Sequence, residues 1–262
     1  GADRFRREYG CEFITADETL INAATLITLS GIDPIQKTGQ VRWYEDIKPN
    51  QTYLIGLDPS AGVGMDYSAI QVFRLPDMCQ VAEWTHNRTS IPQQVRVMQG
   101  ILRHIYDEMR KLPAQRGEPE IYFTLENNSW GEAALVTIDE IGEENFQGQF
   151  LHEPRVRGMP RPRKGMNTNT RSKALACMKL KSLIEGRKIK VSSKTLVRQL
   201  KFFVAKGNSF AAKQGENDDC VMATILCIRM MQVASTWEES FSDLMKDVHD
   251  HEQEPLPISF GF

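Results

Sequence analysis

The sequence predicts an α/β fold built on a mixed sheet, in which three antiparallel strands precede parallel strands and helices cover both faces. Two observations predict it. Strand-like segments follow one another between residues 52 and 86, and from Ile91 onward helical and strand patterns alternate. Consecutive strands followed by alternating helices and strands are typical of a sheet with helices packed against it. A chain of 262 residues, 41% of them hydrophobic, can bury such a core.

The first three strands are predicted from short apolar or β-rich runs separated by turn-forming residues. These runs are TYLIGLD (52–58), SAIQVFRL (68–75) and CQVAEWTHN (79–87). Because the connections between them are short, the simplest arrangement is an antiparallel meander.

The period of the apolar residues then changes from two to three or four. This change predicts an amphipathic helix that starts at Ile91, with an apolar face made of Val95, Met98, Leu102, Ile105 and Met109. The later predicted elements are a strand at 120–126, a helix at 129–141 capped by Ser129, a strand at 148–153, and helices near 171–185, near 195–204 and after Asp218.

Three regions are predicted along the chain. Residues 1–45 mix short helical patterns with turns and read as a linker or the remnant of a preceding domain. Residues 46–235 form the main domain, and residues 236–262 form an acidic tail.

Several classes of protein are not favoured by the sequence. No apolar run approaches the ~20 residues of a membrane span. The five cysteines lack CxxC or Cys/His spacing, so we expect reduced, mostly buried thiols rather than a zinc site. There is no GxxxxGK[ST] phosphate loop, so any ATPase that drives this protein lies elsewhere.

The net charge of −2 conceals a strong asymmetry. Residues 151–207 contain sixteen Lys or Arg against only Glu153 and Glu185. A short basic run usually marks a solvated face, but one this long favours a surface that binds a polyanion such as nucleic acid.

Acidic residues stand at the ends of two predicted strands and at the start of the last helix. Asp58 ends TYLIGLD, Glu126 ends IYFTLE, and Asp218 and Asp219 precede an apolar helix. Singly, each has an ordinary explanation as a turn residue, a solvated strand end or a helix cap. If the first and fourth strands are neighbours, however, these carboxylates converge.

Converging carboxylates repel one another unless a cation neutralises them. Oxygen ligands without His or Cys favour magnesium or manganese over zinc. Two such ions about 4 Å apart can activate a water and stabilise the leaving oxygen of a phosphodiester. His86, His104 and His152 lie in strand or helix patterns, and we expect structural roles for them.

These segments resemble the ribonuclease H-like nucleases, and specifically the nuclease domain of the large terminase subunit of tailed bacteriophages. The likeness rests on YLIGLDPSAGVGMDYSAI, IYFTLENN and GENDDCVMA, and it extends over roughly residues 4–235. It implies that Asp58, Glu126 and Asp218 bind two Mg²⁺ or Mn²⁺ ions. Asp219 and Asp66 are further candidate metal ligands. Asn128 and Trp130 stand next to Glu126 and are expected to shape the site, although a tryptophan at such a position is more often a core residue.

The resemblance also implies a function and partners. The expected activity is cleavage of concatemeric double-stranded viral DNA at the start and end of headful packaging. The expected partners are the ATPase domain of the same full-length protein, the portal protein and the small terminase subunit. The expected location is the host cytoplasm and, transiently, the procapsid portal, but not the mature virion. DNA-binding is assigned to the basic residues Arg161, Arg163, Lys164, Arg171 and Lys173.

Two alternatives remain open from the sequence. One is another ribonuclease H-like nuclease of the resolvase or transposase type. The other is a non-catalytic module that grips DNA and docks on the portal, in which the acids only cap turns and helices.

Overall fold

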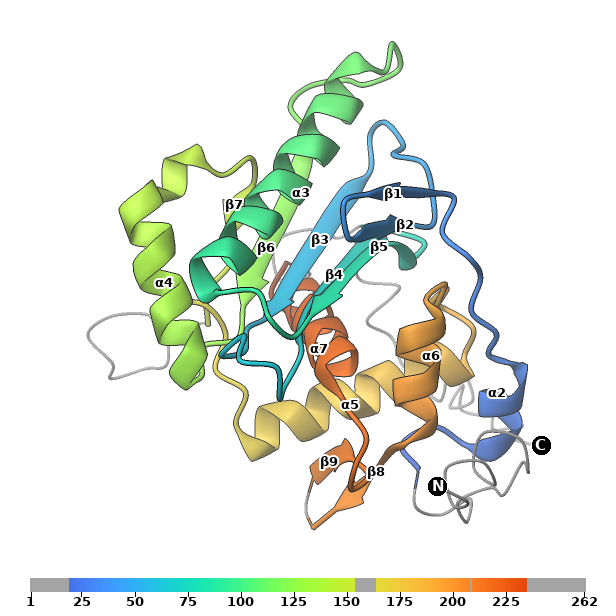
Figure 1. Ribbon diagram of the computed structural model, residues 1–262. Coiled ribbons are helices and arrows are strands. Elements are labelled where there is room, and N and C mark those ends of the chain that lie inside the picture. Colours follow the sequence, from blue (N-terminus) through green and yellow to red (C-terminus); the bar gives the residue numbers. More distant parts are fainter. Residues whose placement is uncertain (1–18, 154–163, 208, 235–262) are drawn as a thin grey trace, which may run out of the picture.

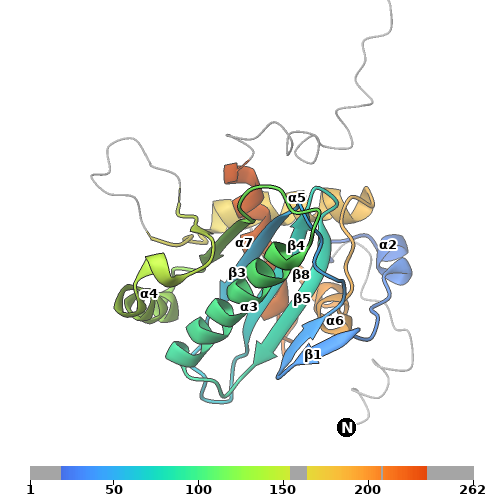
Figure 2. The same ribbon diagram turned by 90° about the horizontal axis from the view of Figure 1, so that it is seen from above.

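The computed structural model describes residues 19–153, 164–207 and 209–234. A seven-stranded sheet in the order β1-β2-β5-β4-β3-β6-β7 forms its centre, and helices lie against both faces (Figures 1 and 2). The predicted mixed sheet is therefore confirmed. Its strands are β1 (Gln36–Thr38), β2 (Val41–Trp43), β3 (Thr52–Asp58), β4 (Ser68–Leu75), β5 (Cys79–His86), β6 (Glu120–Leu125) and β7 (Gln149–Phe150).

The directions of the strands follow from the lengths of their connections. β3, β4 and β5 form an antiparallel meander, in which Thr52 pairs with Leu75 and Asp58 with Ala69. β6 lies on the other side of β3 and runs parallel to it, with Leu57 beside Leu125. The chain reaches β6 through a long helix, which is the usual way to connect parallel strands.

Helices divide between the two faces of the sheet (Figure 2). The long helix α3 (Ile91–Lys111) and α4 (Ser129–Ile141) cover one face. The other face carries α5 (Thr170–Glu185), α6 (Lys194–Lys201) and α7 (Asp219–Ala234). Side chains of β3 alternate between them, since Ile55 and Leu57 pack on the α3 side and Leu54 on the α7 side.

A glycine in β3 lets α7 lie close to the sheet. A Cβ atom added at Gly56 would stand 2.6 Å from the backbone oxygen of Ala223 in α7, well inside van der Waals contact. The buried helix α7 thus crosses β3 at close range, and its first residues come near the carboxyl end of that strand (Figure 1).

The structure also contains elements that the sequence patterns did not predict. The short strands β1 and β2 join the sheet through β5, although they fall within residues 1–45. A separate hairpin, β8 (Phe203–Lys206) and β9 (Ser209–Ala212), precedes α7, and the 3-10 turn η1 (Glu143–Asn145) follows α4. Helix α2 (Ala23–Thr28), by contrast, lies where the sequence showed a short helical pattern. β1 is fully exposed, and so lacks the apolar alternation by which strands are recognised.

Other features of the described residues agree with the composition. Cys79, Cys177, Cys220 and Cys227 are buried free thiols. In the same part of the chain, we find no helix with the length and apolar character that crossing a membrane requires.

Candidate active site

Two carboxylates meet where the parallel strands β3 and β6 end. Asp58 is the last residue of β3, and Glu126 follows β6, with its backbone N–H donating to Leu57 at 3.0 Å. Each residue exposes only 9% of its surface, and the charge of Glu126 acts on the Asp58 carboxyl group. The parallel pairing of the strands therefore brings both acids to the same end of the sheet.

The two aspartates before α7 complete the acidic group. Asp218 occupies the cap position of α7, because its backbone oxygen accepts from the N–H of Met222 at 2.8 Å. Its side chain turns elsewhere, accepting from the N–H of Ala212 at 3.2 Å. Asp219 keeps one carboxylate oxygen, Oδ2, buried without a hydrogen-bond partner.

Helix capping does not account for these aspartates. The side-chain oxygen of Gln199, in α6, accepts from the N–H of Cys220 at 2.8 Å and from that of Val221 at 3.3 Å. Since an amide from another helix already satisfies the N–H groups of Cys220 and Val221, the Asp218 carboxylate and the buried Asp219 Oδ2 are not taken up by capping these two groups.

The electrostatics of the group show that its members act on one another. Burial raises the pKa of Asp58 well above its usual range, and the charges of Glu126, Asp219 and Asp218 raise it further. Burial also raises the pKa of Asp219 to about 6, helped by the charges of Asp218 and Asp66. Asp66 itself is exposed, in the loop that connects β3 and β4.

The donor set fits a hard divalent cation. It consists of carboxylate oxygens, one of which is buried and unpaired, and these groups disfavour one another's ionisation. Among the described residues, however, no three His, Cys, Asp or Glu side chains already stand close enough to enclose an ion. The acids are thus gathered at one place without forming a finished ligand shell.

Residues after Glu126 connect the site to α4. The side-chain nitrogen of Asn128 donates to Glu126 Oε2 at 3.1 Å, and its oxygen accepts from the N–H groups of Trp130 and Gly131. Asn128, rather than the predicted Ser129, is therefore the N-cap of α4. Trp130 is 46% exposed and does not belong to the core, because the buried face of α4 runs through Gly131, Ala134 and Ile138.

Solved structures with the same architecture are nuclease domains of viral large terminases. No family model matches the chain. The large terminase nuclease of thermophilic phage G20c with bound magnesium is 18% identical, with 81% of this chain and 97% of that one covered and a TM-score of 0.57. The corresponding domain of Thermus phage P74-26 is 18% identical over 78% and 92%, with a TM-score of 0.52.

The likeness extends beyond bacteriophages. The human cytomegalovirus terminase nuclease domain is 12% identical, covering 86% of this chain and 98% of that one, with a TM-score of 0.53. Further structures of the G20c nuclease carry cobalt or zinc, and one of the cytomegalovirus domain was soaked with manganese. The chain has the fold of the large terminase nucleases.

Three of the five predicted DNA-binding residues of this terminase-like domain are described. Arg161 and Arg163 lie outside the described residues. Lys164 forms an ion pair with Asp139 of α4, and Arg171 is exposed in the first turn of α5. Lys173 faces the acidic group, with its ammonium 3.9 Å from Asp218 Oδ2 and 5.6 Å from the centre of the Phe203 ring.

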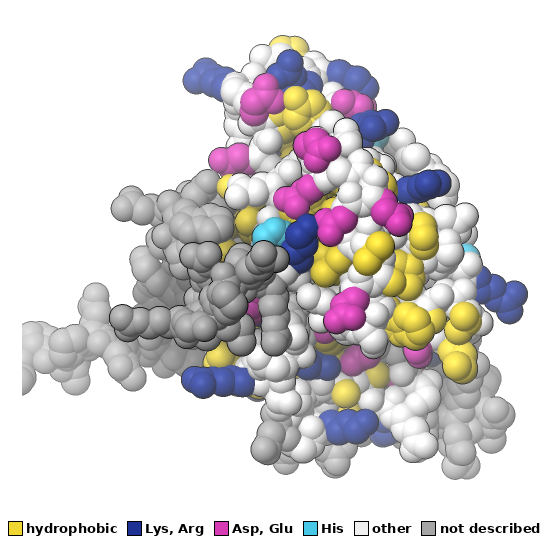
Figure 3. Space-filling view, turned by 90° about the vertical axis from the view of Figure 1, so that its left-hand side faces the viewer, with side chains coloured by type: hydrophobic (Ala, Val, Ile, Leu, Met, Phe, Trp, Pro, Cys, Tyr) yellow, Lys and Arg dark blue, Asp and Glu magenta, His cyan; other side chains and the backbone are white. Residues whose placement is uncertain are grey.

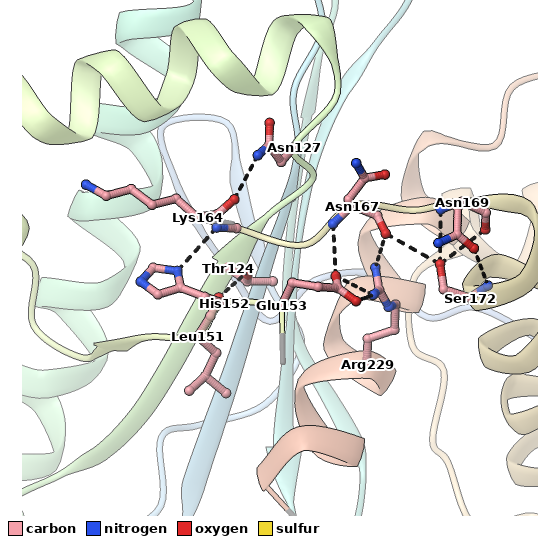
Figure 4. A network of polar contacts seen from close by, with 11 residues as sticks. Thr124, Asn127, Leu151, His152, Glu153, Lys164, Asn167, Asn169, Ser172 and Arg229 are labelled. Atoms are coloured by element: carbon pink, nitrogen blue, oxygen red, sulfur yellow. Dashed lines mark hydrogen bonds and ion pairs between the residues drawn. The ribbon is translucent and has the colours of Figure 1, made fainter. Parts of the chain in front are cut away.

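A polar network that the sequence did not predict joins Arg229 of α7, Glu153 and Asn167 (Figure 4). Arg229 of α7 donates two hydrogen bonds to the carboxylate of Glu153, at 2.8 and 2.7 Å, and a third to the backbone oxygen of Asn167. The N–H of Asn167 in turn donates to Glu153 at 3.1 Å. The network therefore holds α7 to the segment that leads into α5.

That segment also pairs with the end of β6. Met166 donates its N–H to Leu125 at 2.9 Å and accepts from the N–H of Asn127 at the same distance, so Glu126 lies between two backbone contacts. The Asn127 side chain donates to the backbone oxygen of Lys164 at 2.9 Å (Figure 4). Glu126 is thus fixed on one side by β3 and on the other by residues 165–167.

The histidines contact structural groups. His104 packs against Trp43, with ring centres 4.6 Å apart, and His86 shares a hydrogen bond with Thr89 at 2.6 Å. The ring of His152 packs edge-on against Phe150 and accepts from the N–H of Gly165, while burial lowers its pKa.

Proposed function

We propose that the chain is the nuclease domain of a viral DNA-packaging motor, a metal-dependent endonuclease that cuts double-stranded DNA. The observation that carries the proposal is the meeting of Asp58 and Glu126 with the Asp218–Asp219 pair, three segments far apart in the sequence. Buried carboxylates that raise one another's pKa cost stability, and a bound cation offsets that cost. The terminase fold agrees with this reading.

Asp58, Glu126 and Asp218 would hold divalent ions, Mg²⁺ or Mn²⁺, with Asp219 and Asp66 in support. When bound, two such ions lower the pKa of a water nucleophile and stabilise the leaving oxygen of a phosphodiester. Binding of the ions would require these side chains to move from their positions in the structure, because no three of the described acids already enclose an ion. Asp58 must lose its proton to bind, so ion affinity falls as the pH is lowered.

The chain's own residues would orient the DNA through its phosphates. Arg171 and Lys173 on the first turns of α5, with Lys164 and the basic residues Arg161 and Arg163, supply the positive charge. The α4 side is different, since Glu132, Glu140, Glu143 and Glu144 of α4 and η1 are exposed and acidic side chains gather on that face in Figure 3, where Asp139 pairs with Lys164. Repulsion from it would direct a duplex toward α5.

In the packaging motor this domain would cut concatemeric DNA when packaging begins and when the head is full. Its ATPase domain, the portal protein and the small terminase subunit would be its partners in the host cytoplasm, at the procapsid portal. Contacts to phosphate rather than to base edges suit such cutting, because they carry little sequence preference.

The test is cleavage of supercoiled plasmid by the chain with Mg²⁺ or Mn²⁺. Wild type should nick and linearise the plasmid, and Asp58→Ala, Glu126→Ala and Asp218→Ala should each abolish cleavage while DNA binding persists. Asp107→Ala, at an exposed position on α3, is the matched control and should cleave normally. Binding without cleavage under both metals would instead support a non-catalytic DNA-gripping module, and a preference for branched over linear duplex would support a resolvase-type enzyme.

A further inference from the structure

Asn128 makes two sets of contacts with opposite chemistry. Its amide nitrogen donates to Glu126 Oε2 at 3.1 Å. Its amide oxygen accepts from the N–H groups of Trp130 at 3.1 Å and Gly131 at 2.9 Å, which caps α4. Only a side chain with both a donor and an acceptor can do this, so the residue connects the helix N-terminus to the carboxylate.

The backbone around Asn128 leaves little freedom. A Cβ atom added at Gly131 would stand 1.9 Å from the backbone oxygen of Glu126, so the first turn of α4 lies directly on the end of β6. The backbone N–H groups that hold the Asn128 oxygen are therefore fixed relative to Glu126. The direction in which the Asn128 nitrogen points is fixed with them.

We propose that Asn128 is a positioning residue for Glu126, an inference that rests on the proposed nuclease function. By holding Oε2, Asn128 sets the rotation of the Glu126 carboxylate and directs its other oxygen toward Asp58. Without this donor, the carboxylate is free to rotate away from the geometry that a shared ion requires. Hydrogen bonds to metal-binding carboxylates typically contribute about 10–100-fold to metal affinity or activity.

The two roles of Asn128 can be separated by substitution. Serine caps a helix about as well as asparagine, but its short hydroxyl does not reach Glu126. Aspartate also caps, but it replaces the donor with a negative charge beside another carboxylate. Asn128→Ser and Asn128→Asp should therefore keep α4 intact and lose the contact with Glu126. Asn22→Ser is the matched control, because Asn22 is the N-cap of α2 and accepts from the N–H of Thr25 in the same way.

The experiment measures four quantities for each variant: the midpoint of thermal unfolding, DNA affinity without divalent ions, Mn²⁺ binding by calorimetry, and the cleavage rate at saturating DNA. For Asn128→Ser we expect unfolding and DNA affinity close to wild type, Mn²⁺ affinity weaker by about tenfold or more, and a cleavage rate lower by a similar factor. Asn128→Asp should also cleave slowly. Asn22→Ser should match wild type in all four.

Different results overturn the two proposals. If wild type cleaves with Mn²⁺ and Asn128→Ser cleaves and binds Mn²⁺ equally well, the positioning role is refuted while the nuclease function stands. If Asn128→Ser unfolds far below wild type and loses DNA affinity in parallel with cleavage, the residue is structural only, and the inference is again refuted. If wild type itself neither binds Mn²⁺ nor cleaves, the proposed function fails and this inference fails with it.

Discussion

Gly131 of α4 lies against the backbone oxygen of Glu126, so the helix begins directly on the strand end that carries an acidic side chain. A methyl group at this position would collide with the oxygen at 1.9 Å, whereas the only other glycine inside a long described helix, Gly100 of α3, has nothing within 4 Å of such a methyl. The same substitution at these two positions should therefore have opposite effects.

Gly131→Ala should lower the free energy of unfolding by roughly 1–3 kcal/mol, because α4 must move away from Glu126. Gly100→Ala should raise it by about 0.5–1 kcal/mol, because alanine is the better helix former. Urea denaturation followed by circular dichroism measures both. Cleavage should fall in Gly131→Ala and remain normal in Gly100→Ala. Equal stabilisation by the two substitutions would mean that α4 does not press on the strand end.

The acidic site should make the metal-free protein less stable as the pH rises. Burial raises the pKa of Asp219 to about 6 from an ordinary 3.8, so the folded chain binds a proton there more tightly than the unfolded chain does. That stabilisation is complete below pH 3.8 and is lost as the pH rises through 6. The raised pKa of Asp58 acts in the same direction.

Asp219→Asn should therefore be more stable than wild type at pH 8 without divalent ions, by on the order of 1–2 kcal/mol. The difference should shrink as the pH approaches 4. Adding Mg²⁺ should stabilise wild type more than the variant, since it neutralises the repelling carboxylates. Denaturation curves at several pH values, with and without Mg²⁺, measure this. A variant that is less stable than wild type at pH 8 would show that the carboxylate is structural.

The Arg229–Glu153 ion pair should contribute substantially to the free energy of unfolding. Arg229 is 6% exposed and makes three hydrogen bonds, so replacing it with methionine removes the positive charge that pairs with Glu153. Glu153 then keeps only the N–H of Asn167, at 3.1 Å, and the Asn167 oxygen keeps only a long contact from the Ser172 hydroxyl, at 3.4 Å. We expect Arg229→Met to cost roughly 2–4 kcal/mol, less than for a fully buried pair because the Glu153 side chain is 25% exposed.

A surface pair provides the control for this prediction. Arg198 and Glu216 are joined at 3.2 Å, but the Arg198 side chain is 51% exposed, so Arg198→Met should change stability by about 0–1 kcal/mol. Adding Glu153→Gln to Arg229→Met should recover part of the loss, since it removes the unpaired charge. A cost for Arg229→Met no larger than that for Arg198→Met would refute the anchoring role.

Local patterns in the sequence were sufficient to predict the central strands and the first long helix of the fold. The strands at 52–58, 68–75 and 79–86 were predictable because each is an apolar or β-rich run between turn residues, and the helix from Ile91 because its apolar residues recur every three or four positions. β1 and β2 were not, because each has three residues and β1 has no buried face. The β8–β9 hairpin was also missed, since its strands are at most half-buried beyond Phe203 and carry no alternation.

The site was predictable to the level of chain segments but not of contacts. Acids at strand ends and at a helix start indicate a common site once the strand order is known. No local pattern predicts the ion pair between Arg229 and Glu153, which are 76 positions apart. Nor does any local pattern predict that Gln199, rather than an aspartate, caps α7. Those contacts depend on how helices pack across the sheet, and the metal-binding roles of the acids stay predictions.

Arg171 and Lys173 should differ in how they affect DNA binding, although both were predicted as phosphate-binding residues. Arg171 is exposed, whereas the Lys173 side chain is only 19% exposed and is directed to Asp218 and the Phe203 ring. Arg171→Ala should therefore weaken duplex binding and reduce the dependence of the affinity on salt by roughly one ion. Lys173→Ala should affect binding less, and instead change the charge balance at Asp218. Fluorescence anisotropy with a labelled duplex at several salt concentrations, without divalent ions, measures both slopes. A larger change of slope for Lys173→Ala than for Arg171→Ala would mean that the lysine leaves Asp218 to meet the phosphate backbone.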